Sequence, residues 1–298
     1  MKLLKQTLFI VFFLSIGVIQ AQDFSWWDTK HNWDGITQRT DLIIMSPAFM
    51  GPNALPVPMV QNGRIPERFY FEVSGEGHFS NGDDTKGVHT ALFTPLFSDR
   101  VGLHLNWVPV EFFEMDTVTR DIRRAMDRDG KGKNMTDLYF GTYIQLLKDH
   151  AHLPDILVTI NLRTATGNKL SAARTTDAPG YFFDLSFGKT YQINQSMFQS
   201  IRPYAMFGFY VWQIDHKKFR QNDAFLFGLG YDIQMSKLVF KNALGGYAGY
   251  IGNGDNPLVL RASLQTKFNA PINYHCRFQQ GMYDFEYTSF QLGLRLTP

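Results

Sequence analysis

The sequence has little of three things: cysteine, an excess of charge of one sign, and long apolar runs. Cys276 is its only cysteine, which excludes an intramolecular disulfide framework. It has 29 basic and 27 acidic residues, whereas nucleic-acid-binding proteins usually show a basic excess on one face. After residue 21, no stretch supplies the roughly 20 apolar residues that a transmembrane helix needs. We therefore expect no nucleic-acid partner and no membrane-spanning helix in the mature chain.

The first 21 residues differ from everything that follows. Lys2 and Lys5 precede the apolar stretch 8–19, and the small residue Ala21 ends it. A short basic region, an apolar core and a terminal small residue are typical of a secretory signal peptide. Cleavage after Ala21 leaves 298 − 21 = 277 residues, with 29 − 2 = 27 basic residues against 27 acidic ones. No cysteine follows the cleavage site, so we expect an exported, nearly neutral chain without an N-terminal lipid anchor.

The mature chain is instead rich in short segments in which apolar and polar residues alternate. This period of two places successive side chains on opposite faces of a strand. In an exported chain with 27 phenylalanines and 13 tyrosines, repeated segments of this kind are typical of outer-membrane β-barrels. The predicted strands are Arg68–Phe79, His89–Phe97, Val101–Phe113, Asp137–Lys148, Asp155–Thr164, Tyr181–Tyr191, Ile201–Gln213, Asp223–Met235, Leu238–Ile251, Leu258–Phe268, Ile272–Gln279 and Tyr287–Thr297.

The connections between these segments give the barrel a direction. Ser80–Val88, Glu114–Thr136 and Ala165–Gly180 are long or charged, whereas Ser98–Arg100 and Ser236–Lys237 are short. Bacterial barrels have an even number of strands, short periplasmic turns and long external loops. The sequence thus predicts an all-β fold: an antiparallel up-and-down transmembrane barrel of about 12 strands in residues 67–298. Both termini are expected in the periplasm, and the barrel in the outer membrane.

The alternation also assigns the two faces of the wall. In a membrane barrel the apolar set of residues faces lipid and the polar set lines the lumen. The residues predicted to face lipid include Phe227, Leu229, Leu260 and Leu294. Charged residues of both signs are predicted to line the lumen: Glu72, Glu76, Asp155, Arg163, Asp184, Asp232, Arg261, Lys267, Arg277 and Arg295. The alternative is that these charges pair into a closed, packed lumen without conduction.

Residues 22–66 precede the first predicted strand and do not alternate. Prolines at 47, 52, 56 and 58 exclude a central strand or a helix there. Three tryptophans and many other apolar residues in the same segment favour burial over exposure to water. We predict a periplasmic extension that packs into or across the barrel mouth and plugs it. A leader that lies on the surface or is disordered is the alternative.

One short motif at the outer end of the first strand could carry chemistry. A histidine two residues from a serine on a strand shares its face, where imidazole can accept the hydroxyl proton. His78-x-Ser80-Asn81-Gly82 resembles the active-site sequence of outer-membrane phospholipase A, a calcium-dependent barrel, and is similar to that of the lipid A deacylases. The resemblance implies catalytic His78 and Ser80, with calcium as the cofactor. However, residues 91–93 lack the third polar group of those families, and Ser80 is predicted to face the lumen, away from lipid.

We find no other motif that predicts a metal or cofactor site. Residues 127–138 begin like a calcium-binding loop, but Lys131 replaces one ligand and Leu138 replaces the bidentate glutamate. His150 and His152 lie in a predicted turn, where two histidines alone make a weak metal site. Outside the hydrolase alternative we therefore expect neither a metal nor a cofactor.

The style of strands and loops over most of the mature chain resembles uncharacterised Gram-negative outer-membrane barrels similar to porins. The resemblance is carried by Pro154–Thr164 and by Ala173–Asp184. It implies a passive porin-like transporter of small polar or amphiphilic solutes, with outer-membrane lipid and the barrel-assembly machinery as partners. Pro298 replaces the terminal aromatic residue usual in such barrels, so the apolar alternation from Phe290 to Leu296 remains as the assembly signal. The lipid-ester hydrolase and a closed structural barrel or surface receptor are the two alternatives.

Overall fold

The computed structural model describes residues 23–193, 195, 197–214, 218–267 and 271–298. The predicted signal peptide, residues 1–21, lies outside these described residues. The chain divides into two units, Met1–Ile36 and Thr37–Pro298. No helix in the described part of the chain is long and apolar enough to cross a membrane.

The described part of the first unit contains one short helix, α2 (Ser25–His31). The Asp23 carboxylate accepts a hydrogen bond from the Ser25 N–H at 2.9 Å. Lys30 and His31 lie in the last turn, where positive charge suits the helix dipole. Asn32 ends the helix in the left-handed conformation, which asparagine tolerates better than most residues.

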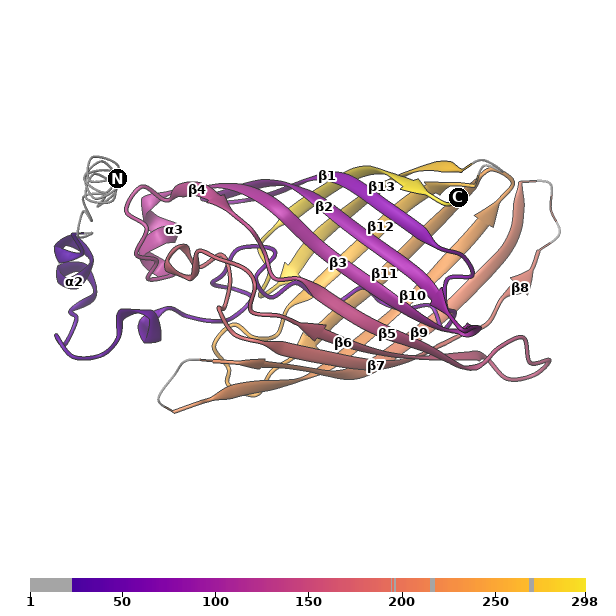
Figure 1. Cartoon of the computed structure of the whole chain (residues 1–298), viewed down its shortest axis with the longest axis horizontal. Helices are drawn as coiled ribbons and strands as arrows, with labels where there is room; N and C mark the ends of the chain where they lie inside the picture. Colours follow the sequence, from indigo (N-terminus) through magenta and orange to yellow (C-terminus); the bar gives the residue numbers. More distant parts are fainter. Residues whose placement is uncertain (1–22, 194, 196, 215–217, 268–270) are drawn as a thin grey trace, which may run out of the picture. The chain divides into compact units, whose positions relative to one another are not determined.

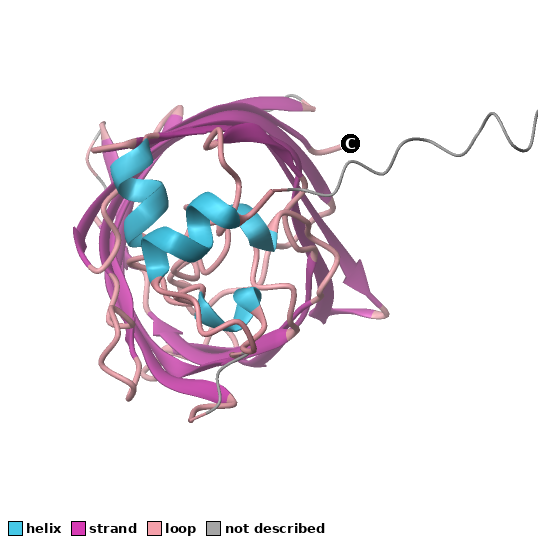
Figure 2. Ribbon diagram, turned by 90° about the vertical axis from the view of Figure 1, so that its left-hand side faces the viewer, coloured by secondary structure: helices cyan, strands magenta, loops and turns pink. Residues whose placement is uncertain are grey.

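The second unit is a closed antiparallel β-barrel, whose strands form a complete ring in Figure 2. Its sheet contains 14 described strands, and without the short β4 and β8 this leaves 14 − 2 = 12 in the wall. The wall strands are β1 (Tyr70–Ser80), β2 (Asp83–Leu96), β3 (Ser98–Met115), β5 (Tyr139–Leu147), β6 (Asp155–Arg163), β7 (Gly180–Gly188), β9 (Phe198–Gln213), β10 (Gln221–Met235), β11 (Leu238–Ala248), β12 (Leu258–Thr266), β13 (Ile272–Tyr283) and β14 (Thr288–Leu296). The remaining elements are η1 (Arg39–Leu42), α3 (Thr117–Ile122), β4 (Lys131–Asn134), η2 (Leu170–Ala172) and β8 (Tyr191–Gln192).

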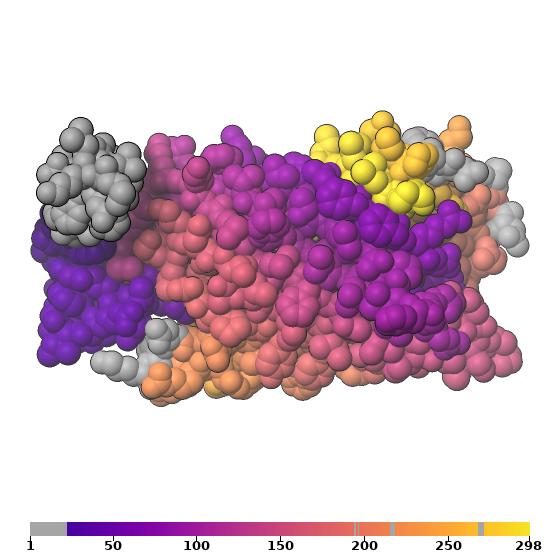
Figure 3. Space-filling view, viewed as in Figure 1, coloured from indigo at the N-terminus to yellow at the C-terminus, as the bar shows by residue number. Residues whose placement is uncertain are grey.

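The predicted fold class is confirmed, and each of the 12 predicted strands overlaps one wall strand. Strands pair with their sequence neighbours, and the ring closes where β1 pairs with β14, from Phe71 opposite Leu296 to Phe79 opposite Thr288. The largest difference is at β2, which begins at Asp83, within the region predicted as a loop. On the side drawn in Figure 3, β1 to β5 form an unbroken outer wall.

The two faces of the wall differ as predicted. Leu229, Leu260 and Leu294 are exposed on the outside, with 64%, 37% and 43% of their surface accessible. Outward phenylalanines pack against each other across neighbouring strands, as Phe183 does with Phe209 at 5.6 Å between ring centroids. A closed barrel with an apolar exterior satisfies its backbone hydrogen bonds internally and presents apolar side chains to lipid.

The two ends of the barrel carry different connections. At one end β1 begins and β14 ends near Pro298, with the short connections Phe97 and 236–237. The opposite end carries the long connections 116–138, 164–179 and 249–257. Figure 1 shows α3 and β4 at this second end, and the C-terminus at the first. We call them the C-terminal end and the long-loop end. On which side of the membrane each end lies stays a prediction.

Candidate functional site

The interior of the barrel holds the part of the chain that precedes β1. Residues 46–66, which we call the lumen segment, cross the barrel once between its two ends. At the long-loop end, the Ser46 hydroxyl donates to the carbonyl oxygen of Gly254 at 3.1 Å. Toward the C-terminal end, the Ile65 N–H donates to Oε1 of Gln145 at 2.7 Å. The extension, which was predicted to pack into or across the barrel mouth, runs along the lumen.

The composition of the lumen segment determines how it is held. Its five prolines have no N–H and disfavour strand pairing, so the segment has more carbonyl acceptors than donors. Buried carbonyl groups need partners, and arginines on the inner face of the wall supply them. Arg163 donates to Ala54 O at 2.9 Å, Arg202 to Asn62 O at 3.0 Å, and Arg261 to Pro58 O at 2.8 Å and to Val57 O.

Glycines in the wall allow the segment to lie against the backbone. A Cβ atom added to Gly188 would lie 2.1 Å from the carbonyl oxygen of Asn62. One added to Gly228 would lie 2.5 Å from Cγ2 of Val60. Both distances are far below van der Waals contact, so larger residues at either position would displace the segment. The wall is thus shaped to fit this segment.

Toward the long-loop end the segment joins an apolar core inside the barrel. Met50, Leu55 and Val57 pack against the buried side chains of Tyr210 and Trp212 of β9. The same core includes Met45, Ala54, Met206, Ile214, Ala224, Leu226, Tyr247, Val259, Phe285 and Tyr287. Close packing of apolar side chains excludes water. Apolar side chains therefore fill much of this half of the lumen.

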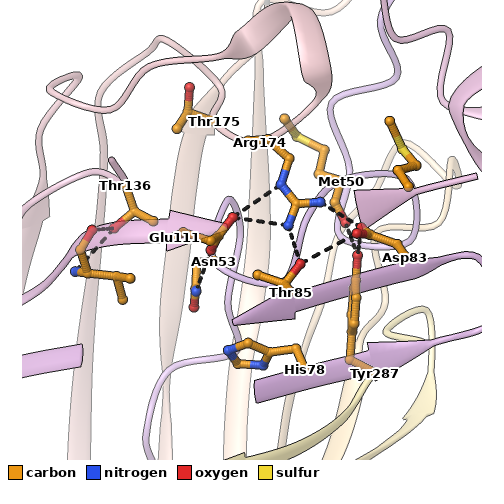
Figure 4. A network of polar contacts seen from close by, with 12 residues as sticks. Met50, Asn53, His78, Asp83, Thr85, Glu111, Thr136, Arg174, Thr175 and Tyr287 are labelled. Carbon is orange, nitrogen blue, oxygen red and sulfur yellow. Dashed lines mark hydrogen bonds and ion pairs between the residues drawn. The ribbon is translucent and has the colours of Figure 1, made fainter. Parts of the chain in front are cut away.

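A buried ionic network ties the long loops together above this core (Figure 4). The Asp83 carboxylate, at the start of β2, accepts hydrogen bonds from Arg123, Arg174 and Tyr287. These donors come from three different connections between strands. Nε and NH2 of Arg174 also lie 3.1 and 3.0 Å from Oε1 of Glu111. One aspartate and one arginine thus join three loops to the wall.

The same network contacts the lumen segment. The Asn53 amide donates to Glu76 at 2.9 Å and to Glu111 at 2.7 Å. The N–H of Gly51 donates to the carbonyl oxygen of Ala173 at 2.9 Å. The loops and the segment therefore hold each other in place.

Two loop residues show opposite effects of burial. Burial alone would lower the pKa of Arg174, but Glu111 and Asp83 raise it above its ordinary value. Its guanidinium therefore stays charged at any physiological pH. Burial raises the pKa of Asp137, although Arg163 lies 3.8 Å away and the Gly167 N–H donates to it at 2.8 Å.

The C-terminal half of the lumen contains a cavity of about 700 Å³, which we call the vestibule. Glu67, Arg68 and Thr297 are among its lining residues, so it extends to the C-terminal end. Its lining has seven basic and three acidic residues: Arg64, Arg68, Lys241, Arg261, Lys267, Arg277 and Arg295, against Glu67, Glu72 and Asp232.

The acidic residues of the vestibule already have partners. Glu72 accepts hydrogen bonds from Arg295 at 2.7 and 3.0 Å, and Asp232 accepts one from Asn62 at 2.9 Å. In the described part of the chain, neither Lys241 nor Arg277 forms an ion pair with a carboxylate at 4.0 Å or less. The lining of the vestibule therefore carries an excess of positive charge.

A smaller cavity of about 170 Å³ continues from the vestibule between the lumen segment and the wall. The two cavities share His89, His104, Arg261 and Arg277. NH1 of Arg277 donates to Gln291 at 2.6 Å, whereas its Nε is buried without a hydrogen-bond partner in the described structure. An anion that entered this cavity could accept a hydrogen bond from that guanidinium.

All ten charged residues predicted to line the lumen lie on the inner face or in these cavities. Six are buried: Glu72, Asp155, Arg163, Asp184, Asp232 and Arg261. Glu76 lines the smaller cavity, and Lys267, Arg277 and Arg295 line the vestibule. Several of them pair, as Asp155 does with Arg202 at 2.9 Å. The lumen therefore contains both paired charges and charges that line a cavity.

His78 and Ser80 have different hydrogen-bond partners. Nδ1 of His78 lies 2.7 Å from the hydroxyl of Ser289, and its Nε2 lies 3.3 Å from Glu76. The Ser80 hydroxyl donates instead to the carbonyl oxygen of Asp83 at 3.1 Å. Among the described residues no hydrogen bond joins the two. The resemblance to phospholipase A is therefore not supported by the arrangement of its motif.

The sequence predicts neither a metal nor a cofactor outside the hydrolase alternative, and this stays a prediction. Within the described ranges, no group of three or more histidine, cysteine, aspartate or glutamate side chains could hold a metal ion.

Sequence reasoning placed Arg163 and Arg261 in the lumen but missed Arg202, which also holds the lumen segment, and the loop residues Arg123 and Arg174. Arg123 and Arg174 lie in connections where arginine is usually solvated, so no local signal distinguishes them. A signal for Arg202 and its neighbours did exist, because a buried proline-rich segment needs donors from elsewhere. Inward-facing arginines of the strands were the available donors.

No protein-family model matches the chain, and no curated protein matches it. The COG4313 outer membrane channel from Pseudomonas putida F1 has a similar structure, with a TM-score of 0.52 and 12% identity over 80% of this chain and 98% of that chain. The KdgM porin gives 0.44 and 8% identity over 76% and 99% of the two chains. The transport unit of the autotransporter AIDA-I from Escherichia coli gives 0.44 and 7% identity over 85% and 99%. At these identities the likeness shows the fold, and this fold is that of an outer-membrane β-barrel.

Proposed function

We propose that the protein is an outer-membrane channel for small polar solutes, that it prefers anions, and that its lumen segment closes it. The observation that carries the proposal is the basic vestibule at the C-terminal end. Unpaired charges in the wall of a barrel lower its stability. A polar cavity of this size is therefore better explained by the binding of a solute than by a structural role. The similar fold of an outer membrane channel supports this proposal.

The charge of the vestibule supports anions over cations. Seven basic side chains outnumber three acidic ones there, and Glu72 and Asp232 are engaged by neighbours. A cleft lined by one sign of charge, with walls of low dielectric constant, concentrates ions of the opposite sign. Lys241 and Arg277 are the residues we assign to this attraction.

Conduction requires the lumen segment to shift. It packs with Tyr210, Trp212 and Tyr247 in the long-loop half, and the cavity that remains beside it has a volume of only about 170 Å³. The same observation favours one rival, a closed structural barrel or surface receptor whose segment never moves. The two functions differ in whether removing the segment reveals a selective pore.

Conductance of the purified protein in planar bilayers tests the proposal. We expect rare openings in the wild type and steady conductance in a variant that lacks residues 23–60. In a KCl gradient, the reversal potential of this variant should show preference for chloride. Replacing Lys241→Glu in the open variant should shift it toward potassium. Replacing Lys133→Glu, an exposed lysine of β4, is the matched control and should leave selectivity unchanged.

Because a deletion of this length can prevent folding, Arg261→Met provides a second route. It removes two donors to the lumen segment while the whole chain is kept, and it should raise the frequency of openings. If both variants fold and neither conducts, the protein is a closed scaffold or receptor. A pore that prefers potassium before any substitution would contradict the anion assignment.

A further inference from the structure

The path of the lumen segment has a direction relative to the chain. Its contacts with the wall proceed in order from the long-loop end, beginning where Ser46 contacts Gly254. They continue at Ala54, at Val57 and Pro58, and at Asn62, and they finish at Ile65 beside Gln145. The chain thus enters the lumen at the long-loop end and leaves it at the C-terminal end to begin β1.

The lumen segment is long enough to cross the barrel once but too short to cross it twice. From Ser46 to Ile65 there are 65 − 46 = 19 residue steps, which span at most about 65 Å when fully extended. The long wall strand β9 has 16 residues. With a strand tilt of 35–45°, it spans about 40 Å along the barrel axis. A segment that entered and returned by the same mouth would need about 80 Å over the same height.

The residues just before the segment remain at the long-loop end. Ile43 and Met45 are buried there, Met45 within the apolar core, and η1 precedes them. Gln38, which belongs to the same unit as the barrel, is exposed. The chain therefore emerges from the barrel before residue 43.

We infer that the chain preceding the barrel is threaded through its own lumen, so that Gln38 lies at the cell surface while the C-terminus lies in the periplasm. Long connections of bacterial barrels are external and short ones periplasmic, which makes the long-loop end external. This differs from the sequence-based expectation of a periplasmic extension. The inference does not depend on whether the barrel conducts.

The location of Gln38 can be measured by cysteine labelling in intact cells. A Cys276→Ser background removes the one native thiol, which is exposed on the barrel. Gln38→Cys is then treated with a membrane-impermeant maleimide before and after the outer membrane is permeabilised. Asp129→Cys marks the long-loop end, and Ser236→Cys marks the C-terminal end; both positions are exposed.

We expect Gln38→Cys to label in intact cells to the same extent as Asp129→Cys, whereas Ser236→Cys labels only after permeabilisation. Labelling of Gln38→Cys only after permeabilisation, together with Ser236→Cys, would place the segment's start in the periplasm and overturn the inference. Labelling of Ser236→Cys but not Asp129→Cys in intact cells would show that the barrel has the opposite orientation in the membrane. That result would also overturn the inference. Heat-modifiable migration in SDS gels confirms that each variant is folded before it is scored.

Discussion

Replacing Arg174→Met should destabilise the barrel by about 3–5 kcal/mol, the usual cost of removing one partner of a buried ion pair. The substitution removes the donors to Glu111, Asp83 and Thr85 in one step. Asp83 keeps Arg123 and Tyr287 as donors, whereas Glu111 keeps only the Asn53 amide among the hydrogen bonds described. Most of the loss therefore comes from the buried Glu111 carboxylate.

Methionine is chosen because it can still pack against the aromatic ring that the arginine contacts. The Arg174 guanidinium lies 4.7 Å from the centre of the Phe113 ring, and a thioether also packs well against an aromatic ring. The measured loss will then report mainly the contacts of the charged group, the cation–π contact with Phe113 included. At 1.4 kcal/mol per factor of ten, a loss of about 3 kcal/mol lowers the folding equilibrium constant by more than a hundredfold.

Urea unfolding in lipid vesicles, followed by tryptophan fluorescence, measures this change. Arg100→Met is the matched control, because Arg100 is exposed at the C-terminal end and its loss should cost at most about 0.5 kcal/mol. Adding Glu111→Gln to Arg174→Met should recover part of the loss, since a neutral amide is easier to bury than a carboxylate. A loss below about 1 kcal/mol for Arg174→Met, or no recovery in the double variant, would refute the reasoning.

Three further outcomes are expected. Leu229→Arg places a charge on the lipid face and should cost about 2–4 kcal/mol near the midplane, measured by urea unfolding against Leu229→Ala; equal losses would contradict its exposure to lipid. Arg261→Lys should open less often than Arg261→Met in bilayer recordings, because one ammonium still reaches a carbonyl of the lumen segment. Asp137 has a raised pKa when folded, so its contribution to stability is present below about pH 4, its unfolded pKa, and is lost as the pH rises through the folded pKa. Asp137→Asn should therefore gain stability relative to the wild type as the pH rises above about 4, and parallel pH profiles would exclude a raised pKa.

The wall of the barrel could be predicted from the sequence because its signal is local. Every second residue of a membrane strand faces lipid, so apolar residues recur with a period of two wherever lipid is in contact. The start of β2 shows where that signal ends. Asp83 and Thr85 point inward to Arg174, while Asp84 and Lys86 are exposed. With polar residues on both faces beyond the lipid, this part of the strand has the composition of a loop.

The route of the lumen segment could not be derived in the same way. Its prolines exclude a helix or a central strand, but they do not indicate where in the barrel the segment runs. Its route depends on contacts such as Asn62 with Arg202, 140 positions apart in sequence. Arg174 is a similar case, since its burial depends on carboxylates from two distant strands. Contacts between residues so far apart in the sequence produce no periodic pattern that a single sequence could reveal.

The covalent link between the lumen segment and β1 has a consequence for the order of assembly. β1 is also the strand that closes the ring, pairing with β14 across positions as far apart as Phe71 and Leu296. Met50 and Leu55 of the segment are buried. Once that seam has formed, their side chains could enter the lumen only by passing Trp212 and Tyr247. The segment therefore has to be in place while the sheet is still open, and the strands curl around it. We therefore expect substitutions that loosen the segment to slow barrel closure even where they leave the finished barrel stable.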